Sequence, residues 1–487
     1  MTLLDPTTTW HGKIFSDGWV KADGGDAAVL EPATGAEIGR TGVAGPDDIT
    51  RACARAAAAQ RAWATTSFEE RASVLRRAGQ LWEEHATEIG DWVVRESGAI
   101  GPKAALETHV AAQECYEAAA LPSRPLGEII PSTSPRMSLA RRVPAGVVGV
   151  IAPFNFPLIL AIRSVAPALA LGNAVVLKPD PRTAVSGGVA IARVFEEAGL
   201  PDGLLHVLPG GAATGESLVA DPHVRVVSFT GSTTAGRAVG QLAARHLKRA
   251  HLELGGNSAL IVLDDADLDL AVSAGAWGSF LHQGQICMTT GRHLVHESVA
   301  ERYVAELAEH ANRLPVGDPA REQVALGPII DERQRDRVHA LVTASVQDGA
   351  TLAAGGTYEG LFYRPTVLAG VRPSTPAFRE EVFGPVAPVI SFADLDQAVA
   401  LATDTEYGLS LGILSRDVMK ALDLAERIPS GIVHINDQTV GDEAVVPFGG
   451  VGSSGTGARF GGAAANVDAF TETQWVTLQG TVTSYPF

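Results

Sequence analysis

Short apolar runs rich in β-branched residues alternate with helical stretches through the middle of the chain. The first four runs lie at residues 147–151, 174–177, 204–208 and 226–229. Each gap between them is long enough for a crossover helix, which parallel neighbouring strands require. The alternation resumes near Ser258 and continues through residues 386–390 and 410–414. The pattern therefore predicts an α/β protein in which a second α/β unit follows the first.

The ends of the chain carry different patterns. Residues 1–45 mix short apolar runs with Gly and Pro turns, which predicts peripheral strands. Helical spacing follows at 46–63, 68–96 and 101–120, and the first of these opens with Pro-Asp-Asp, which is typical of a helix start. Residues 124–142 contain three prolines and residues 466–487 are polar and β-prone. We expect both to be extended and to pair with each other or with another subunit.

Composition and charge exclude several classes of partner. The net charge is −17 and Lys and Arg form no dense run, which argues against a nucleic acid or an anionic membrane surface. The longest apolar region, 146–171, is broken by Pro153, Asn155, Pro157 and Arg163, so it is not a membrane span. Three widely spaced cysteines favour neither a disulfide framework nor a metal site, and no export signal is expected at residues 1–10. A reducing cytoplasm suits this composition.

A single cysteine, Cys287, follows a Gly-Gln turn in the stretch FLHQGQIC at residues 280–287. A lone cysteine is more often an inert buried thiol than a nucleophile, so a catalytic interpretation needs partners elsewhere in the chain. Three candidates lie upstream: Asn155 in PFNFP, Lys178 in LKP and Glu253 in ELGG.

Together these four segments, in this order, resemble the aldehyde dehydrogenase superfamily over almost the whole chain. The resemblance implies a dinucleotide-binding domain with a Rossmann-like fold at residues 1–123 and 143–254, and a catalytic α/β domain at 255–465. It also implies that residues 124–142 and 466–487 form a small β arm and tail for oligomerisation, in a homodimer or a homotetramer.

The resemblance gives roles to three of these residues. Cys287 would add to the aldehyde carbonyl carbon, since hydride leaves readily only from a tetrahedral, electron-rich carbon. The oxyanion would accept hydrogen bonds from the backbone N–H of Cys287 and from the side-chain amide of Asn155. Glu253 would be the general base that activates water to hydrolyse the thioester.

A turn at residues 230–236 follows the strand predicted at 226–229. Its glycines, Gly231 and Gly236, have the spacing G-x-x-x-x-G, with Ser232 as a helix cap. Alone, this is weak evidence, because a tight capped turn explains it equally well. Within the resemblance it matches the dinucleotide turn, which lets backbone and a helix N-terminus approach a pyrophosphate.

Other cofactor contacts are implied by the resemblance alone. Lys178 would hold the adenine-ribose hydroxyls, Glu381 would hold the nicotinamide ribose, and Phe383 would pack near the nicotinamide. NAD is the expected cofactor. Many relatives carry an acid three positions after the lysine, but this chain has Pro181 preceded by Asp180, so NADP stays open as well.

The substrate is predicted to be an aromatic aldehyde. Residues 431–440, the Pro-Phe loop at 447–448 and the closing Tyr-Pro-Phe are similar to bacterial benzaldehyde dehydrogenases, with vanillin and salicylaldehyde enzymes close by. Phe156, Leu160 and Phe448 fall where the family lines its substrate tunnel. Benzaldehyde is favoured, and an aliphatic aldehyde, transfer of the acyl group to coenzyme A, and a catalytically silent dinucleotide-binding protein are the alternatives.

Overall fold

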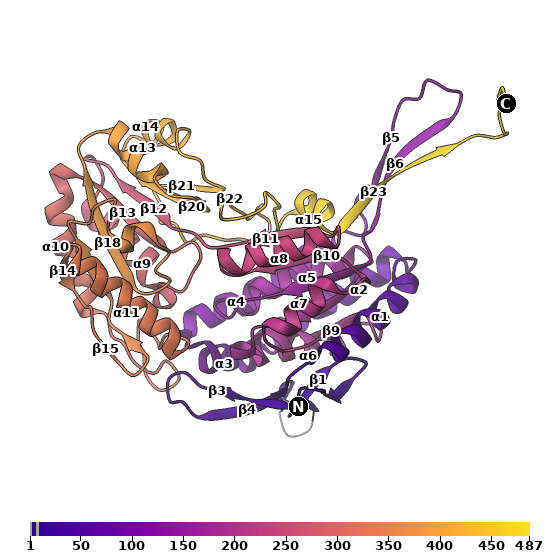
Figure 1. Ribbon diagram of the computed structural model, residues 1–487, viewed down its shortest axis with the longest axis horizontal. Helices are drawn as coiled ribbons and strands as arrows, with labels where there is room; N and C mark the ends of the chain where they lie inside the picture. Colours follow the sequence, from indigo (N-terminus) through magenta and orange to yellow (C-terminus); the bar gives the residue numbers. More distant parts are fainter. Residues whose placement is uncertain (1, 6–8) are drawn as a thin grey trace.

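The computed structural model describes residues 2–5 and 9–487, which form two lobes and a projecting arm (Figure 1). The expected absence of an export signal at residues 1–10 falls partly outside the described residues. No helix within residues 2–5 and 9–487 is both long and apolar enough to cross a membrane.

The first lobe is built on a seven-stranded sheet with the order β11-β10-β7-β8-β9-β1-β2. Its parallel strands are β7 (Val147–Ile151), β8 (Ala174–Lys178), β9 (Leu205–Val207), β10 (Val224–Thr230) and β11 (Arg249–Glu253), and the antiparallel β1 (Lys13–Phe15) and β2 (Trp19–Lys21) form one edge. The four strands predicted between residues 147 and 229 are confirmed. Strand β11 was not predicted, because Arg249 and His251 interrupt its apolar pattern.

Within the described residues, eight α-helices come before β11, the last strand of this sheet in the sequence. They are α1 (Pro46–Trp63), α2 (Phe68–Glu84), α3 (Ala86–Ser97), α4 (Gly101–Ala119), α5 (Ile159–Ala170), α6 (Ala190–Glu197), α7 (Ala212–Ala220) and α8 (Thr233–Arg245). A single helix over 68–96 is wrong, since His85 leaves the helical conformation at φ −110° and ψ 16° and separates α2 from α3. Its ring Nδ1 lies 3.3 Å from Glu88 Oε2 in the first turn of α3.

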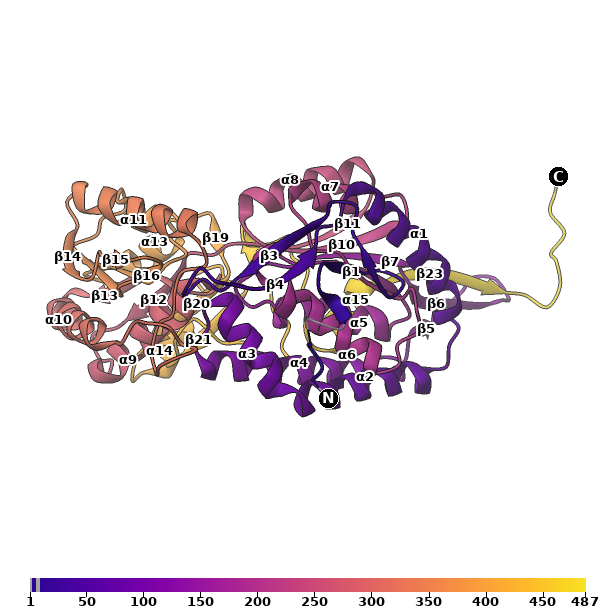
Figure 2. The same cartoon turned by 90° about the horizontal axis from the view of Figure 1, so that it is seen from below.

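The second lobe, like the first, is a sheet with helices packed against it (Figure 2). Its seven-stranded sheet contains, in order, β14 (Thr351–Ala354), β17 (Thr366–Ala369), β18 (Val386–Phe392), β13 (Thr290–His296), β12 (Ser258–Val262), β20 (Ser410–Leu414) and β21 (Ile432–Ile435). The helices of this lobe are α9 (Leu268–Phe280), α10 (Glu297–Arg313), α11 (Glu332–Gln347), α12 (Pro376–Arg379), α13 (Leu395–Thr403) and α14 (Val418–Ala425). The α/β unit predicted from Ser258 onwards is therefore confirmed.

The arm is a three-stranded sheet of β5 (Gly127–Ile129), β6 (Met137–Pro144) and β23 (Thr471–Leu478), and it extends away from both lobes in Figure 1 and Figure 2. The expected pairing of the arm with the tail is observed, with Trp475 opposite Ala140. The expectation that residues 466–487 are extended is wrong for 466–470. These residues belong to α15 (Ala463–Phe470), and Phe470 is fully buried against His251 and Phe460.

Shorter elements complete the described chain. They are the hairpins β3–β4 (Asp26–Leu30, Glu37–Gly42) and β15–β16 (Tyr358–Glu359, Phe362–Tyr363), the pair β19–β22 (Tyr407–Gly408, Val451–Gly452), 3-10 turns at Pro181–Thr183 and Leu281–Gly284, and a π-helical turn at Val185–Val189.

Candidate active site

The cysteine loop follows α9 through a left-handed turn. His282, Gln283 and Gly284 all have positive φ, at 49°, 56° and 64°. A side chain at position 284 would place its Cβ 2.1 Å from the Gly384 carbonyl oxygen, so glycine is required there. Gln283 Nε2 fixes the turn by donating to the carbonyls of Gly98 at 2.9 Å and Pro328 at 2.7 Å. The turn delivers the free, half-buried thiol of Cys287 between the lobes.

The structure brings Asn155 to this loop. Strand β7 ends at Ile151, and the Pro-Phe-Asn-Phe-Pro loop carries Asn155 into a buried position. Its side-chain Nδ2 donates to the Gln285 carbonyl at 2.8 Å. An amide nitrogen has two hydrogens, so one fixes the side chain and the other is free to meet a substrate oxygen.

A buried ion pair from α4 supports the Asn155 loop. The Lys103 ammonium donates to a Glu107 carboxylate oxygen one turn away and to the Asn155 carbonyl at 2.6 Å. The second Glu107 oxygen accepts from the backbone N–H groups of Leu158 at 3.0 Å and Ile159 at 3.5 Å, where α5 begins. These two residues were not predicted, although a Lys and a Glu four residues apart are visible in the sequence.

Glu253 ends β11 beside the loop that contains Gly449. Its backbone carbonyl accepts from Gly231 N at 3.0 Å, which ties it to the turn after β10. The carboxylate is buried, and neither oxygen has a hydrogen-bond partner in the described part of the chain. Burial raises the pKa of Glu253 well above its usual range, against the attraction of the Arg459 and Arg163 guanidiniums. A carboxylate with a raised pKa and free oxygens is a stronger base than a solvated one, which suits it to accept a proton.

The electrostatics of the site hold Cys287 as a thiol. Burial, then the nearby carboxylates of Glu381 and Glu253, raise the pKa of Cys287 to about 12. Glu381 itself accepts from Gly256 N at 3.0 Å, and burial raises its pKa to about 7. Gly255 leaves room for this carboxylate, because a Cβ there would lie 2.4 Å from Glu381 Oε2. The thiol therefore needs a base, which Glu253 and Glu381 both offer.

The predicted dinucleotide turn joins β10 to α8. Ser232 caps the helix, accepting from Ala235 N at 3.3 Å; Thr233 is buried, whereas Ser232, Thr234 and Ala235 are exposed. A side chain at Gly236 would place its Cβ 2.2 Å from Leu254 Cδ2, and one at Gly231 would meet the Phe229 ring at 2.7 Å. Both glycines are thus needed for packing as well. The free N–H groups of this thirteen-residue helix fit a pyrophosphate.

Lys178 lies in the first lobe and Phe383 in the second. Lys178 is the last residue of β8, and its ammonium donates to the Pro179 carbonyl at 3.1 Å. Phe383 has a positive φ of 53° and its ring meets the Phe154 ring edge-to-face at 6.0 Å. Ribose hydroxyls fit a buried ammonium of this kind, because it has donors to spare.

Apolar residues surround the thiol. Phe448 is buried in a cluster with Ile286, Met288 and Leu409, against which Phe156 and Cys287 pack. Leu160 is also buried, and its backbone N–H donates to the Phe156 carbonyl at 3.0 Å. Phe156, Phe448 and Cys287 therefore share one apolar cluster, and Leu160 lies one turn farther along the chain; their role as a substrate pocket stays a prediction.

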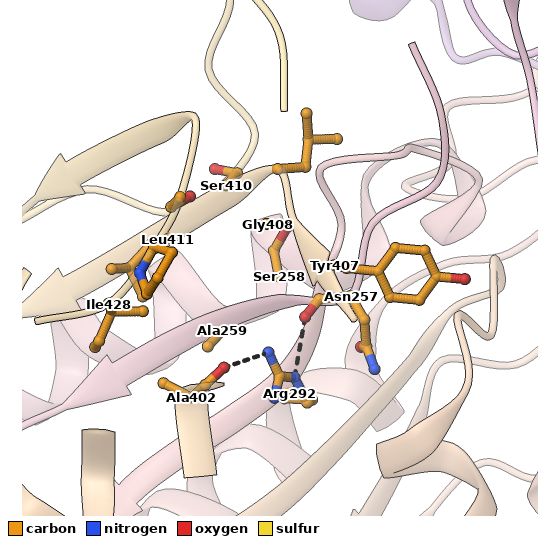
Figure 3. A pocket seen from close by; sticks show the side chains of 13 residues that line it. Asn257, Ser258, Ala259, Arg292, Ala402, Tyr407, Gly408, Ser410, Leu411 and Ile428 are labelled. Carbon is orange, nitrogen blue, oxygen red and sulfur yellow. Dashed lines mark hydrogen bonds between the residues drawn. The ribbon is translucent and has the colours of Figure 1, made fainter. Parts of the chain in front are cut away.

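A separate cavity of about 20 Å³ is lined by residues of β12, β13 and β20 and of the neighbouring loops (Figure 3). The Arg292 side chain crosses it and donates to the carbonyls of Asn257 at 2.9 Å, Leu401 at 2.9 Å and Ala402 at 3.1 Å. Ser258 Oγ and Asn257 Oδ1 have no hydrogen-bond partner within the described residues. A space of this size holds about one water molecule and no aldehyde.

Comparison with known proteins adds to this geometry. A family model described as "Aldehyde dehydrogenase family" matches residues 19–476. A vanillin dehydrogenase from Amycolatopsis sp. is 70% identical over 100% of both chains, and a benzaldehyde dehydrogenase (NAD(+)) from Pseudomonas putida is 52% identical over 98% of both. The crystal structure of a salicylaldehyde dehydrogenase from Pseudomonas putida G7 complexed with salicylaldehyde superimposes with a TM-score of 0.94, at 35% identity, over 98% of this chain and 99% of that one.

Proposed function

This chain belongs to the aldehyde dehydrogenase family, and we propose that it oxidises an aromatic aldehyde to the carboxylic acid, with a nicotinamide dinucleotide as the hydride acceptor. The observation that carries this proposal is the convergence of Cys287, Asn155 and Glu253. Cys287 follows the 3-10 turn after α9, Asn155 lies in the loop after β7, and Glu253 ends β11. The Asn155 amide bonds to the cysteine loop, the Glu253 charge acts on the thiol, and the thiol packs in the apolar cluster of Phe156 and Phe448.

The chain's own residues can perform each step. Glu253 takes the proton of the Cys287 thiol, and the sulfur adds to the aldehyde carbon. The oxyanion formed there accepts hydrogen bonds from Cys287 N and from the free hydrogen of Asn155 Nδ2. The nicotinamide, when bound, supplies the site that accepts hydride. Loss of hydride leaves a thioester on Cys287. Glu253, having released its first proton to solvent, then removes a proton from water, which attacks the thioester and displaces the sulfur to release the acid.

The cofactor is proposed to be NAD, with NADP tolerated. Asp180 would repel a 2′-phosphate if its charge were free, but it accepts from Arg182 Nε at 2.9 Å and Nη2 at 2.8 Å. The same guanidinium donates to Asp331 at 2.7 Å. Its positive charge lowers the pKa of Asp180 and offsets its repulsion. Replacing Arg182 with Met should therefore raise the NAD-to-NADP preference in kcat/KM.

Self-association is proposed through the arm. Ile129, Met137, Trp475 and Leu478 are exposed on the three-stranded sheet that extends from the lobes. A thin sheet with large apolar side chains in solvent gains stability when a second copy covers them. Three free cysteines, one of them at the candidate site, suit a reducing compartment such as the cytoplasm.

Turnover of an aldehyde panel with each cofactor tests the activity directly. Benzaldehyde, vanillin, salicylaldehyde and a short aliphatic aldehyde should be compared by the absorbance of the reduced nicotinamide. We expect the aromatic aldehydes to give the highest kcat/KM without added coenzyme A. The Cys287→Ala variant should bind cofactor and oxidise none of them, whereas Cys115→Ala, which replaces a buried thiol on α4, should retain the activity. A dependence on coenzyme A, or a preference for the aliphatic aldehyde, would contradict the proposal.

A further inference from the structure

Arg163 is a buried charge in the first turns of α5. Its side chain is 2% exposed, and Nη2 contacts Asp442 Oδ2 at 2.5 Å and Glu114 Oε1 at 3.5 Å. The guanidinium carbon lies 4.7 Å from the centroid of the Phe448 ring. Arg163 therefore joins two acids to an aromatic wall of the candidate substrate pocket.

The guanidinium has unused hydrogen-bonding capacity. Nε and Nη1 are buried, and neither finds a partner among the described residues. Asp442 Oδ1 is likewise a buried acceptor with no partner in that part of the chain. Buried donors and acceptors of this kind are costly when unpaired, so a polar group from outside the chain is expected to meet them.

The unpaired groups lie close to the reacting centre. Leu160 and Arg163 are three residues apart on α5, so they share a face of that helix. Phe448, beneath the guanidinium, packs in the cluster that also contacts Cys287. The positive charge of Arg163 opposes the rise in the pKa values of Cys287 and Glu253, which places it within electrostatic reach of both.

We propose that Arg163 and Asp442 recognise a hydroxyl group on the ring of the aldehyde substrate. A phenolic hydroxyl accepts a hydrogen bond from Arg163 Nε or Nη1 and donates its own hydrogen to Asp442 Oδ1, so it satisfies both unpaired groups at once. Unsubstituted benzaldehyde satisfies neither. This inference rests on the proposed function and narrows its substrate class to hydroxylated aromatic aldehydes.

Polar recognition of this kind discriminates strongly against a substrate that lacks the hydroxyl. A pocket with buried polar groups rejects the analogue because those groups are left unpaired. A hydrogen bond to a charged group contributes on the order of a 10- to 100-fold difference in kcat/KM. We expect the wild-type protein to prefer meta- or para-hydroxybenzaldehyde to benzaldehyde by that factor.

The test compares these aldehydes across a set of variants. Arg163→Met removes the donors, Arg163→Lys keeps the charge but loses the planar fork, and Asp442→Asn changes the acceptor. The matched control is Ser164→Ala, whose hydroxyl lies 2.8 Å from Ser228 Oγ and touches neither acid. Arg163→Met should abolish the preference for the hydroxylated aldehyde, Arg163→Lys and Asp442→Asn should reduce it, and Ser164→Ala should keep it.

Two results would overturn the assignment. One is equal kcat/KM for the two aldehydes in the wild type, and the other is an equal loss for both in Arg163→Met. If Arg163→Met does not fold, three other measurements decide. They are the ratio of kcat/KM for the hydroxylated and the unsubstituted aldehyde in the wild type, the same ratio in Asp442→Asn, and inhibition of the wild type by para-hydroxybenzoate compared with benzoate. A wild type that oxidises only aliphatic aldehydes refutes the proposed function and this inference with it. Equal oxidation of both aromatic aldehydes refutes the inference alone.

Discussion

Among the residues that support the candidate site, the buried ion pair of Lys103 and Glu107 is the one whose loss should lower stability and turnover most. Lys103→Met keeps an unbranched side chain of similar length but removes the ammonium. Both side chains of the pair are completely buried, and the ammonium also holds the Asn155 carbonyl at 2.6 Å. The variant therefore leaves the Glu107 carboxylate without its cation and the Asn155 carbonyl without its hydrogen-bond donor.

The loss of stability can be bounded. Removing one partner of a buried ion pair costs about 3 to 5 kcal/mol, because the remaining charge is uncompensated. Burial already raises the pKa of Glu107, which Lys103 opposes, so in the variant Glu107 will take up a proton and limit the loss to about 3 kcal/mol. A carboxyl whose folded pKa is raised binds its proton more tightly in the folded state. The variant's stability should therefore fall as the pH rises above about 4.3, the unfolded value for Glu.

The loss of turnover has a different cause. Without the hydrogen bond from Lys103, the loop is less firmly held, and the Asn155 amide can move away from the position of the oxyanion. Removal of one oxyanion donor costs about 10²- to 10³-fold in rate, which is the upper limit for Lys103→Met. We expect kcat to fall at least about tenfold, with cofactor affinity little changed.

Two measurements check this prediction. Urea unfolding should show that Lys103→Met with Glu107→Gln is more stable than Lys103→Met alone, because no buried charge is left. Steady-state turnover should stay low in that double variant, since the carbonyl anchor is still missing. The effects of Lys103→Met and Asn155→Ala on kcat should be far from additive. Additive effects, or an unchanged kcat in Lys103→Met, would refute the positioning role.

Other predictions follow from the site and the arm. Glu253→Gln should release about one reduced cofactor per active site, in a burst that is slowed because the amide cannot take the Cys287 proton, and then stall because it cannot activate water. Unimpaired steady-state turnover in rapid-mixing absorbance would contradict this. The pKa of Cys287 is raised to about 12, so the rate of its alkylation by iodoacetamide without cofactor should rise about tenfold per pH unit from about pH 7 to about pH 10. Mass spectrometry measures this rate, and a rate that stops rising before about pH 10 would contradict the prediction. A chain ending at Phe470 keeps α15 but lacks β23, so it should stay folded and lose its oligomeric mass in light scattering.

Local sequence patterns predicted most of the fold because the central strands of both sheets are continuous apolar runs. Strands β7, β8 and β12 are buried along their whole length, so each has the composition that a parallel core strand requires. The misses occur where polar residues enter an element. Strand β11 carries an Arg and a His, and the break at His85 has neither a Gly nor a Pro to mark it.

The candidate catalytic residues could be proposed from the sequence because each lies in a compact motif, and the motifs together and in order carry the family resemblance. Lys103 and Glu107 could not, since a Lys and a Glu at this spacing are usually a solvated pair on a helix surface. Their burial depends on the packing of α4 against α5 and on a loop 52 residues away. No local pattern contains that information.

The environment of Arg163 could be predicted in part. This residue is the one charged residue in the sequence of α5, and a charge in so apolar a helix must find a partner if the helix is buried. The sequence therefore predicts that an acid meets it. It cannot predict that one acid comes from α4 and the other from position 442, 279 residues farther on, or that Nε and Nη1 stay unpaired. Those unpaired donors arise because two elements distant in sequence deliver their carboxylates to the same end of one guanidinium, and so the other end is left for a substrate.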